Sequence, residues 1–174
     1  VEEAASKLGF DIIINVQGDM PLVDPDSLFA LTQPLLQDEN IHYTDMMAPI
    51  IEKSEINNAN VVKVVSSLSG NAMYYTRETI PSPRKAGRQK IRYFKQLGIN
   101  AFRRDSLKHF TSLARTPLEI IESVDMNRLL ENGLHIKLIK TESVTIGVDT
   151  PEDLLLVDDL MNGDILFPKY KDFK

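Results

Sequence analysis

The segment Phe10-Asp11-Ile12-Ile13-Ile14-Asn15-Val16-Gln17-Gly18-Asp19-Met20-Pro21 decides the fold of this chain. Its apolar run is short and rich in Ile and Val, and Gly, Asp and Pro follow soon after. This pattern is typical of a buried strand in a parallel sheet. Ligands of such sheets bind beyond the carboxyl ends of the strands. Asp19 lies just past that end, in a turn where Gly18 permits a wide range of backbone conformations. Its carboxylate is therefore a candidate metal ligand.

The composition of the 174-residue chain is that of an ordinary globular protein, with 43% hydrophobic and 26% charged residues. No stretch approaches the roughly 20 apolar residues that span a bilayer, so no membrane partner is expected. The net charge of −5 argues against a general nucleic-acid binder. The absence of Cys excludes disulfides and Cys-based zinc sites, and it fits a cytoplasmic location.

Residues 1–8 have the apolar spacing of the tail of an amphipathic helix, and they lead directly into the strand that contains Ile12–Ile14. A domain of this kind rarely begins with its first strand in the middle of a sheet. We therefore expect that an N-terminal part of the domain is missing.

Strands and helices alternate along the chain. Asp24 is a good N-cap and Pro25 suits the first helical position, so a helix is predicted from there to about Gln37. Further strands are expected at 42–51, 61–65, 72–75, 93–102 and 134–139, and further helices at 105–114, 117–131 and 152–161. The second and third of these strands form a hairpin. The whole predicts an α/β fold, a mostly parallel sheet flanked by helices with an inserted hairpin and flap.

Asp149 is a second candidate metal ligand, because it follows Gly147 and Val148 and precedes a helix start. Thr150 already serves as the N-cap of that helix, which leaves the Asp149 carboxylate free. Asp19 and Asp149 taken singly are also compatible with ordinary turn or cap residues. Two carboxylates at strand ends suit Mg²⁺, which takes one or two carboxylates together with substrate phosphates.

A basic stretch follows the hairpin, from Arg77 to Lys95. It has two interpretations: a solvated loop, or an anion site for a phosphate or a sugar carboxylate. Arg77 comes directly after a strand, so we expect it to have a fixed position. The three His residues show no metal-ligand spacing, and no P-loop, G-x-G-x-x-G or G-x-S-x-G motif occurs. Phosphoryl or nucleotidyl transfer fits this set of residues best.

Five segments add specificity. They are NVQGDMPL at 15–22, NANVVKVV at 58–65, AMYYTRETIP at 72–81, TPLE at 116–119 followed by Glu122, and GVDTPEDL at 147–154. In this order they resemble motifs of the 3-deoxy-manno-octulosonate cytidylyltransferase family, the CMP-Kdo synthetases. The resemblance covers nearly all of the chain.

The resemblance implies a nucleotide-diphospho-sugar transferase fold and a reaction in which CTP activates the acidic 3-deoxy sugar Kdo for lipopolysaccharide synthesis, releasing pyrophosphate. It implies that Asp19 and Asp149 are catalytic residues that bind Mg²⁺. Gln17 and Arg77 match positions that contact the sugar acid, with Arg77 placed to pair with its carboxylate.

The resemblance also implies a domain organisation. Residues 1–174 would form one cytidylyltransferase-like domain, in which 61–103 is a flap at the sugar site and the dimer interface of a homodimer. The family's N-terminal strand and basic loop, which hold the nucleotide, would be missing from it.

The chain departs from the family motifs on the sugar side. Gln96 and Asn100 stand where the family has His and Tyr, Asp125 shortens a contacting carboxylate, and Met126 replaces a contacting Gln. These four are the remaining candidate substrate-binding residues. Three interpretations stay open: family drift with Kdo unchanged, a CMP-sugar synthetase for 8-amino-Kdo or another acidic sugar, and a catalytically silent, dimerising module.

Overall fold

The computed structural model of the protein describes residues 1–143, 146–148 and 150–170. The strands are β1 (Ile12–Asn15), β2 (Tyr43–Pro49), β3 (Lys63–Ser66), β4 (Ala72–Thr76), β5 (Phe94–Arg103) and β6 (Lys137–Lys140). The helices are α1 (Glu2–Leu8), α2 (Pro25–Gln37), α3 (Lys53–Ile56), α4 (Arg104–Ser112), α5 (Pro117–Glu122), α6 (Met126–Glu131), α7 (Pro151–Asn162) and α8 (Phe167–Tyr170), with a 3₁₀ turn at Pro83–Lys85. No helix among these is long and apolar enough to cross a membrane.

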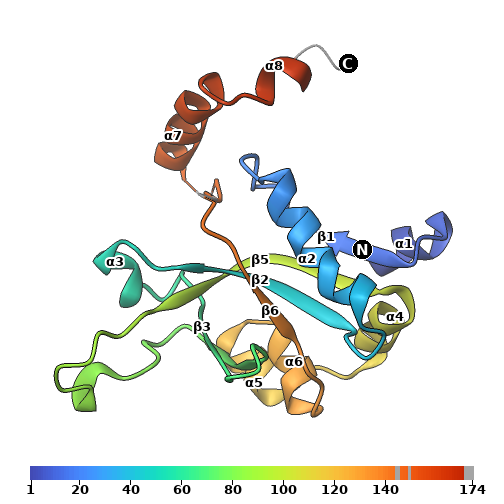
Figure 1. Cartoon of the computed structure of the whole chain (residues 1–174), viewed down its shortest axis with the longest axis horizontal. Helices are drawn as coiled ribbons and strands as arrows, with labels where there is room; N and C mark the ends of the chain where they lie inside the picture. Colours follow the sequence, from blue (N-terminus) through green and yellow to red (C-terminus); the bar gives the residue numbers. More distant parts are fainter. Residues whose placement is uncertain (144–145, 149, 171–174) are drawn as a thin grey trace.

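The strands form one sheet in which β5 is central (Figure 1). Along one edge β5 pairs with β2, and along the other it pairs first with β3 and then with β1, always antiparallel. The pairing of β2 with β6 is the parallel one among the described strands. The α/β class and the helix-flanked sheet are confirmed, but the prediction of mostly parallel pairing is wrong. The chain from β2 to β5 passes through a hairpin instead of crossover helices, so β5 returns between β1 and β2.

Strand β1 is less buried than its apolar sequence predicts. Ile14 is 36% exposed, and β5 is the one strand that β1 pairs with among the described residues. A strand with a single paired neighbour lies at a sheet edge, which accounts for its partial exposure.

Apolar side chains pack on both faces of β2 and β5. On one face Leu31 and Leu35 of α2 contact a cluster that includes Ile99 and Ala101 of β5. On the other face the helices α4 and α6 pack against Tyr43, Met47 and Phe102, among others. Figure 1 shows α2 on one side of the sheet and α5 and α6 on the other. Side-chain alternation along β5 therefore separates two cores.

Two local predictions differ in their outcome. Helix α2 begins at Pro25 and ends at Gln37 as predicted, and its N-cap Asp24 accepts hydrogen bonds from the N–H groups of Asp26 and Ser27. The single helix expected at 117–131 is instead two helices, because Ser123 adopts a left-handed conformation with φ 54°. This break turns the chain so that Val124 is buried while Ser123 and Asp125 line a pocket.

Replacing Asp24 with Ala should destabilise the protein by about 1–2 kcal/mol, because the first turn of α2 loses its capping acceptor. One carboxylate oxygen lies 3.2 Å from the Asp26 nitrogen and the other 3.1 Å from that of Ser27. Urea unfolding measures the loss. Asp24→Asn keeps an acceptor and should lose less, and equal stabilities of the two variants would contradict the capping role.

Candidate active site

A pocket of about 610 Å³ lies on the α4–α6 side of the sheet, where β1, β5 and the α5–α6 junction meet. Of the predicted site residues, the structure places these at its lining: Gln17, Asp19, Arg77, Gln96, Asn100 and Asp125. Met126 does not belong to the lining and is buried in the core beneath it. Asp149 lies outside the described residues. The pocket therefore brings together side chains from four separate segments of the sequence.

The Asp19 carboxylate has an unsatisfied oxygen. Its Oδ1 atom is buried and has no hydrogen-bond partner among the described residues. The Asp19 carbonyl accepts a hydrogen bond of 2.9 Å from the N–H of Val148, the residue before Asp149 in the sequence. An orphaned buried acceptor is costly unless a ligand completes it, and a hard carboxylate oxygen suits Mg²⁺. Asp19 thus fits the predicted role, while the pair with Asp149 stays a prediction.

Gln17 lies against Gly98, at a point where β5 has no room for a side chain. A Cβ atom at Gly98 would lie 2.5 Å from Nε2 of Gln17, and Gly98 has φ +70°. The sequence analysis did not assign Gly98 a role. A glycine inside a strand is a recognised signal of close approach by another group, so the position was open to prediction.

Arg77 is held in the pocket wall by backbone carbonyls. Its Nε donates to the Glu122 carbonyl at 2.6 Å, Nη1 to that of Ala59 at 2.9 Å, and Nη2 to that of Ser123 at 3.4 Å. The position is fixed, as the sequence predicts. Because a guanidinium has more N–H donors than these three bonds use, Arg77 keeps donors for an anionic ligand.

Two charged residues, the partly buried Glu122 and the buried Lys63, hold Arg77 and its surroundings in place. The Glu122 carboxylate accepts hydrogen bonds from the Arg77 backbone N–H, the Tyr74 hydroxyl and the Thr76 hydroxyl. Burial raises the pKa of Glu122, but these bonds outweigh it and leave the pKa below the usual value. Lys63 is 0% exposed, and its Nζ donates to the carbonyls of Asn58, Val61 and Arg77.

A polar row that crosses three strands runs from the pocket lining into the protein interior. Asn15 of β1 pairs with Asn100 of β5, which pairs in turn with Asp45 of β2. The Oδ1 atom of Asn100 is buried without a partner among the described residues. Gln96 donates from Nε2 to Oδ2 of Asp45 at 2.9 Å. The sequence analysis missed Asp45, although an acidic residue inside an otherwise apolar strand was a visible signal.

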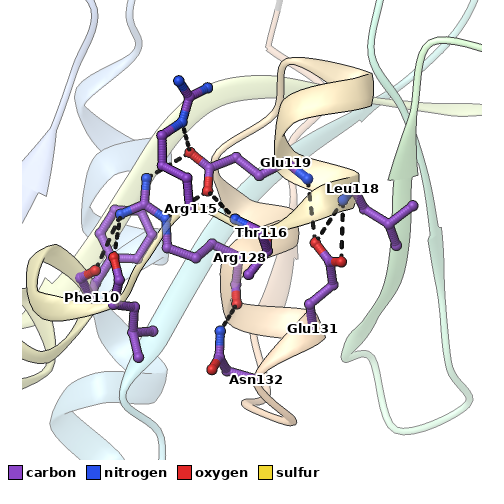
Figure 2. Close-up of polar contacts among 9 residues, drawn as sticks. Phe110, Arg115, Thr116, Leu118, Glu119, Arg128, Glu131 and Asn132 are labelled. Atoms are coloured by element: carbon purple, nitrogen blue, oxygen red, sulfur yellow. Dashed lines mark hydrogen bonds and ion pairs between the residues drawn. The ribbon is translucent and has the colours of Figure 1, made fainter.

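An ion-pair network closes the end of the pocket at α5 and α6 (Figure 2). Glu119, which is 3% exposed, accepts hydrogen bonds from Arg128 at 2.6 and 2.7 Å and from Arg115 at 3.0 Å. The Arg128 bonds are the main cause that lowers the pKa of Glu119 to about 2. Glu131 accepts from the N–H groups of Leu118 and Glu119, which caps α5. Of the capping box predicted at Thr116, the bond from the Thr116 N–H to the Glu119 carboxylate is present at 3.3 Å, whereas the Thr116 hydroxyl oxygen has no partner among the described residues.

Some charged residues of the pocket form ion pairs and others do not, within the described part of the chain. Lys95 pairs with Glu55, and Arg115 pairs with Glu119. Within the described ranges, Asp19 and Asp125 form no ion pair. The same ranges contain no cluster of three His, Cys, Asp or Glu residues that could hold a metal.

The family model described as cytidylyltransferase matches residues 1–139. The chain belongs to the cytidylyltransferase family. Curated relatives are named 3-deoxy-manno-octulosonate cytidylyltransferase. That of Syntrophotalea carbinolica is 36% identical over 168 residues, which cover 92% of this chain and 67% of the relative. That of Acidobacterium capsulatum is 41% identical over 157 residues, covering 90% and 63%.

Two solved structures are similar to this chain, and the first of them agrees with this assignment. A CMP:2-keto-3-deoxy-manno-octonic acid synthetase complexed with CTP superposes with a TM-score of 0.85 at 35% identity, covering 93% of this chain and 66% of that one. A structure described as a glucose-1-phosphate thymidylyltransferase from Bacillus anthracis has a TM-score of 0.55 at 13% identity, covering 91% and 58%, and shows likeness of fold alone. The chain spans about two thirds of the length of the cytidylyltransferases that it matches.

In this cytidylyltransferase, Gly98→Ala should destabilise the fold by about 1–2 kcal/mol from backbone strain, and by a small further amount because the flexible end of the Gln17 side chain must shift. Gly133→Ala is the matched control, since Gly133 has φ +73° with no atom near the added Cβ. Urea unfolding compares the two. A second change, Gln17→Ala, should recover part of the loss only in the Gly98→Ala background. Equal losses at the two glycines would contradict the contact.

Glu119→Gln should destabilise the protein by about 3 kcal/mol at neutral pH, because Arg128 stays buried without its carboxylate. The folded pKa of Glu119 is about 2 against an ordinary 4.5. Its stabilising contribution is therefore complete above pH 4.5 and is lost as the pH falls toward 2. The free energy of unfolding, measured between pH 4.5 and 2, should therefore depend less steeply on pH in the variant than in the wild type. Glu3→Gln, at an exposed pair with Lys7, should change neither quantity.

Proposed function

We propose that this protein is a cytidylyltransferase that couples CTP to an acidic 3-deoxy sugar of the Kdo type and releases pyrophosphate. The observation that carries the proposal is the orphaned, buried Oδ1 of Asp19 in the same pocket as Arg77 and Gln17. A cation, a carboxylate and a hydrogen-bonding amide are the groups that such a reaction needs from the sugar side of a site.

In the proposed reaction, the anomeric hydroxyl oxygen of the sugar forms a bond to the α-phosphorus of CTP. The bond from that phosphorus to the oxygen bridging to the β-phosphate breaks, pyrophosphate leaves with the electron pair, and the hydroxyl proton passes to solvent water. Arg77 pairs with the sugar carboxylate, and Gln17 hydrogen-bonds the sugar. Because Lys63 and Glu122 fix the Arg77 backbone, the sugar is held in one orientation, and such positioning supplies much of the rate enhancement.

Asp19 and Asp149 are the proposed Mg²⁺ ligands. When bound, Mg²⁺ supplies positive charge that offsets the triphosphate and helps to activate the sugar hydroxyl. Asp19 would contribute its Oδ1, the buried oxygen that lacks a protein partner.

Further parts of the proposal rest on the family resemblance. We expect a homodimer in the cytoplasm that serves lipopolysaccharide synthesis, with residues 61–103 as a flap at the sugar site. The contribution of Arg77, Lys95 and Gln96 to the pocket supports the role of this segment. The changes at Gln96, Asn100 and Asp125 favour an acidic sugar other than Kdo as the second candidate substrate.

Asp19→Asn should abolish pyrophosphate release from CTP, because the amide oxygen carries no charge for the metal. The assay uses Mg²⁺ and a panel of acidic sugars that includes Kdo and 8-amino-Kdo. Asp158→Asn, on the exposed face of α7, is the control and should leave turnover unchanged. The shift of the melting temperature that Mg²⁺ produces should also disappear in Asp19→Asn.

Near-normal turnover of Asp19→Asn would remove this residue from the metal site. Absence of pyrophosphate release by the wild type with every sugar would reject the enzyme and leave the silent, dimerising module.

A further inference from the structure

Asp45 is a buried acid that the proposed reaction does not use. It is 0% exposed in the middle of β2, where the other side chains are apolar or, as with Thr44, face the opposite side of the sheet. Its Oδ1 accepts from the Met46 N–H at 3.1 Å and its Oδ2 from Gln96 at 2.9 Å. It forms no ion pair in the described part of the chain. Keeping such a carboxyl is costly, so its contact with Gln96 calls for a reason.

The contact fixes the orientation of the Gln96 amide. An ionised carboxylate has only acceptor atoms, so it holds the NH₂ end of the amide, and the Oε1 end is left for other partners. Gln96 lines the pocket. With Asp45 ionised, the Gln96 side chain therefore offers the sugar a hydrogen-bond acceptor. A protonated Asp45 can donate to Oε1 instead, which lets the amide turn over and offers the sugar a donor.

The groups around Asp45 disfavour its charge. Burial is the main cause that raises its pKa to about 7, and the Asp125 charge at the start of α6 adds to it, whereas the nearby Tyr75 hydroxyl and the bond from Gln96 lower it. From β4 the buried Tyr75 hydroxyl faces Asp45 without reaching hydrogen-bond geometry. From β5 the Asn100 amide lies opposite, and from β6 the neighbour is Leu138. Both protonation states are accessible near neutral pH.

We infer that Asp45 is a positioning residue for sugar specificity, which decides through the Gln96 amide whether the pocket floor accepts or donates a hydrogen bond. The inference rests on the proposed function. With Asp45 ionised, the Oε1 end of Gln96 presents an acceptor, and the Asp125 carboxylate, which also lines the pocket, presents acceptors as well. A sugar group that donates a hydrogen bond to this end of Gln96 is then favoured over one that only accepts.

The test is the Michaelis constant for the sugar, measured from pH 6 to 9 in wild type and Asp45→Asn. In the wild type the Michaelis constant for the sugar should fall about fivefold as the pH rises through 7, because the sugar gains about one hydrogen bond. In Asp45→Asn it should be independent of pH, while kcat and the Michaelis constant for CTP follow the wild type. Gln96→Met, which removes the amide and keeps Asp45, should abolish the same dependence and covers the case in which Asp45→Asn fails to fold.

Thr44→Val is the matched control. Thr44 is equally buried in β2, but its hydroxyl faces α2 and donates to the Leu31 carbonyl. This variant should lose stability and keep the pH dependence of the wild type. An unchanged pH dependence in Asp45→Asn and in Gln96→Met, with turnover intact, would overturn the role of Asp45 and leave the proposed function standing. Absence of turnover by the wild type would reject both.

Discussion

The pairing of β5 with three other strands is the constraint on which the rest of the structure depends. Backbone hydrogen bonds to β2 on one edge and to β3 and β1 on the other fix β5 along its whole length. Gln96, Gly98 and Asn100 on this strand reach the pocket. Gln17 packs against Gly98 of this strand. Arg77 directly follows β4, which pairs with β3, and β3 pairs in turn with β5. A shift of β5 would therefore displace the proposed sugar-binding and metal-binding residues together.

Buried and partly buried charges stabilise the loops that the sheet does not fix. Lys63 binds three backbone carbonyls, and Glu122 binds the backbone and side chains after β4. Glu119 of α5 binds Arg128 of α6 through an ion pair and so fixes the two helices to each other. Each charged group is satisfied by several partners, which offsets the cost of taking it out of water. The motif residues that resemble the family thus include supports of the site as well as groups that face the ligand.

Local signals in the sequence predicted local structure well. Asp24 with Pro25 and Thr116 with Glu119 set helix starts at the expected residues, because capping depends on neighbours within one turn. The left-handed conformation of Ser123 had no such signal, since the burial of Val124 and Met126 against distant residues imposes it. The direction of β5 was missed for the same reason: strand pairing is decided by residues far apart in the sequence.

In the candidate site, too, the residues within sequence motifs were predictable, whereas contacts between distant residues were not. The motifs predicted Gln17, Asp19, Arg77, Gln96, Asn100 and Asp125, all of which the fold brings to one pocket. Met126 was assigned to the sugar by position alone, and the turn at Ser123 directs it into the core instead. Asp45 and Gly98 act through Gln96 and Gln17, and such pairwise relations appear only when the strands are assembled.

The alternation of side chains along β5 has an evolutionary consequence. Ile99 and Ala101 pack against α2, while Gln96 and Asn100 face the pocket. Substitution of a pocket-facing residue therefore leaves the hydrophobic packing of its neighbours intact. Selection can change recognition at Gln96 and Asn100, though not at Gly98 between them, while the intervening positions preserve folding. A strand of this kind lets a family exchange one sugar for another by small genetic steps, each passing through a folded protein.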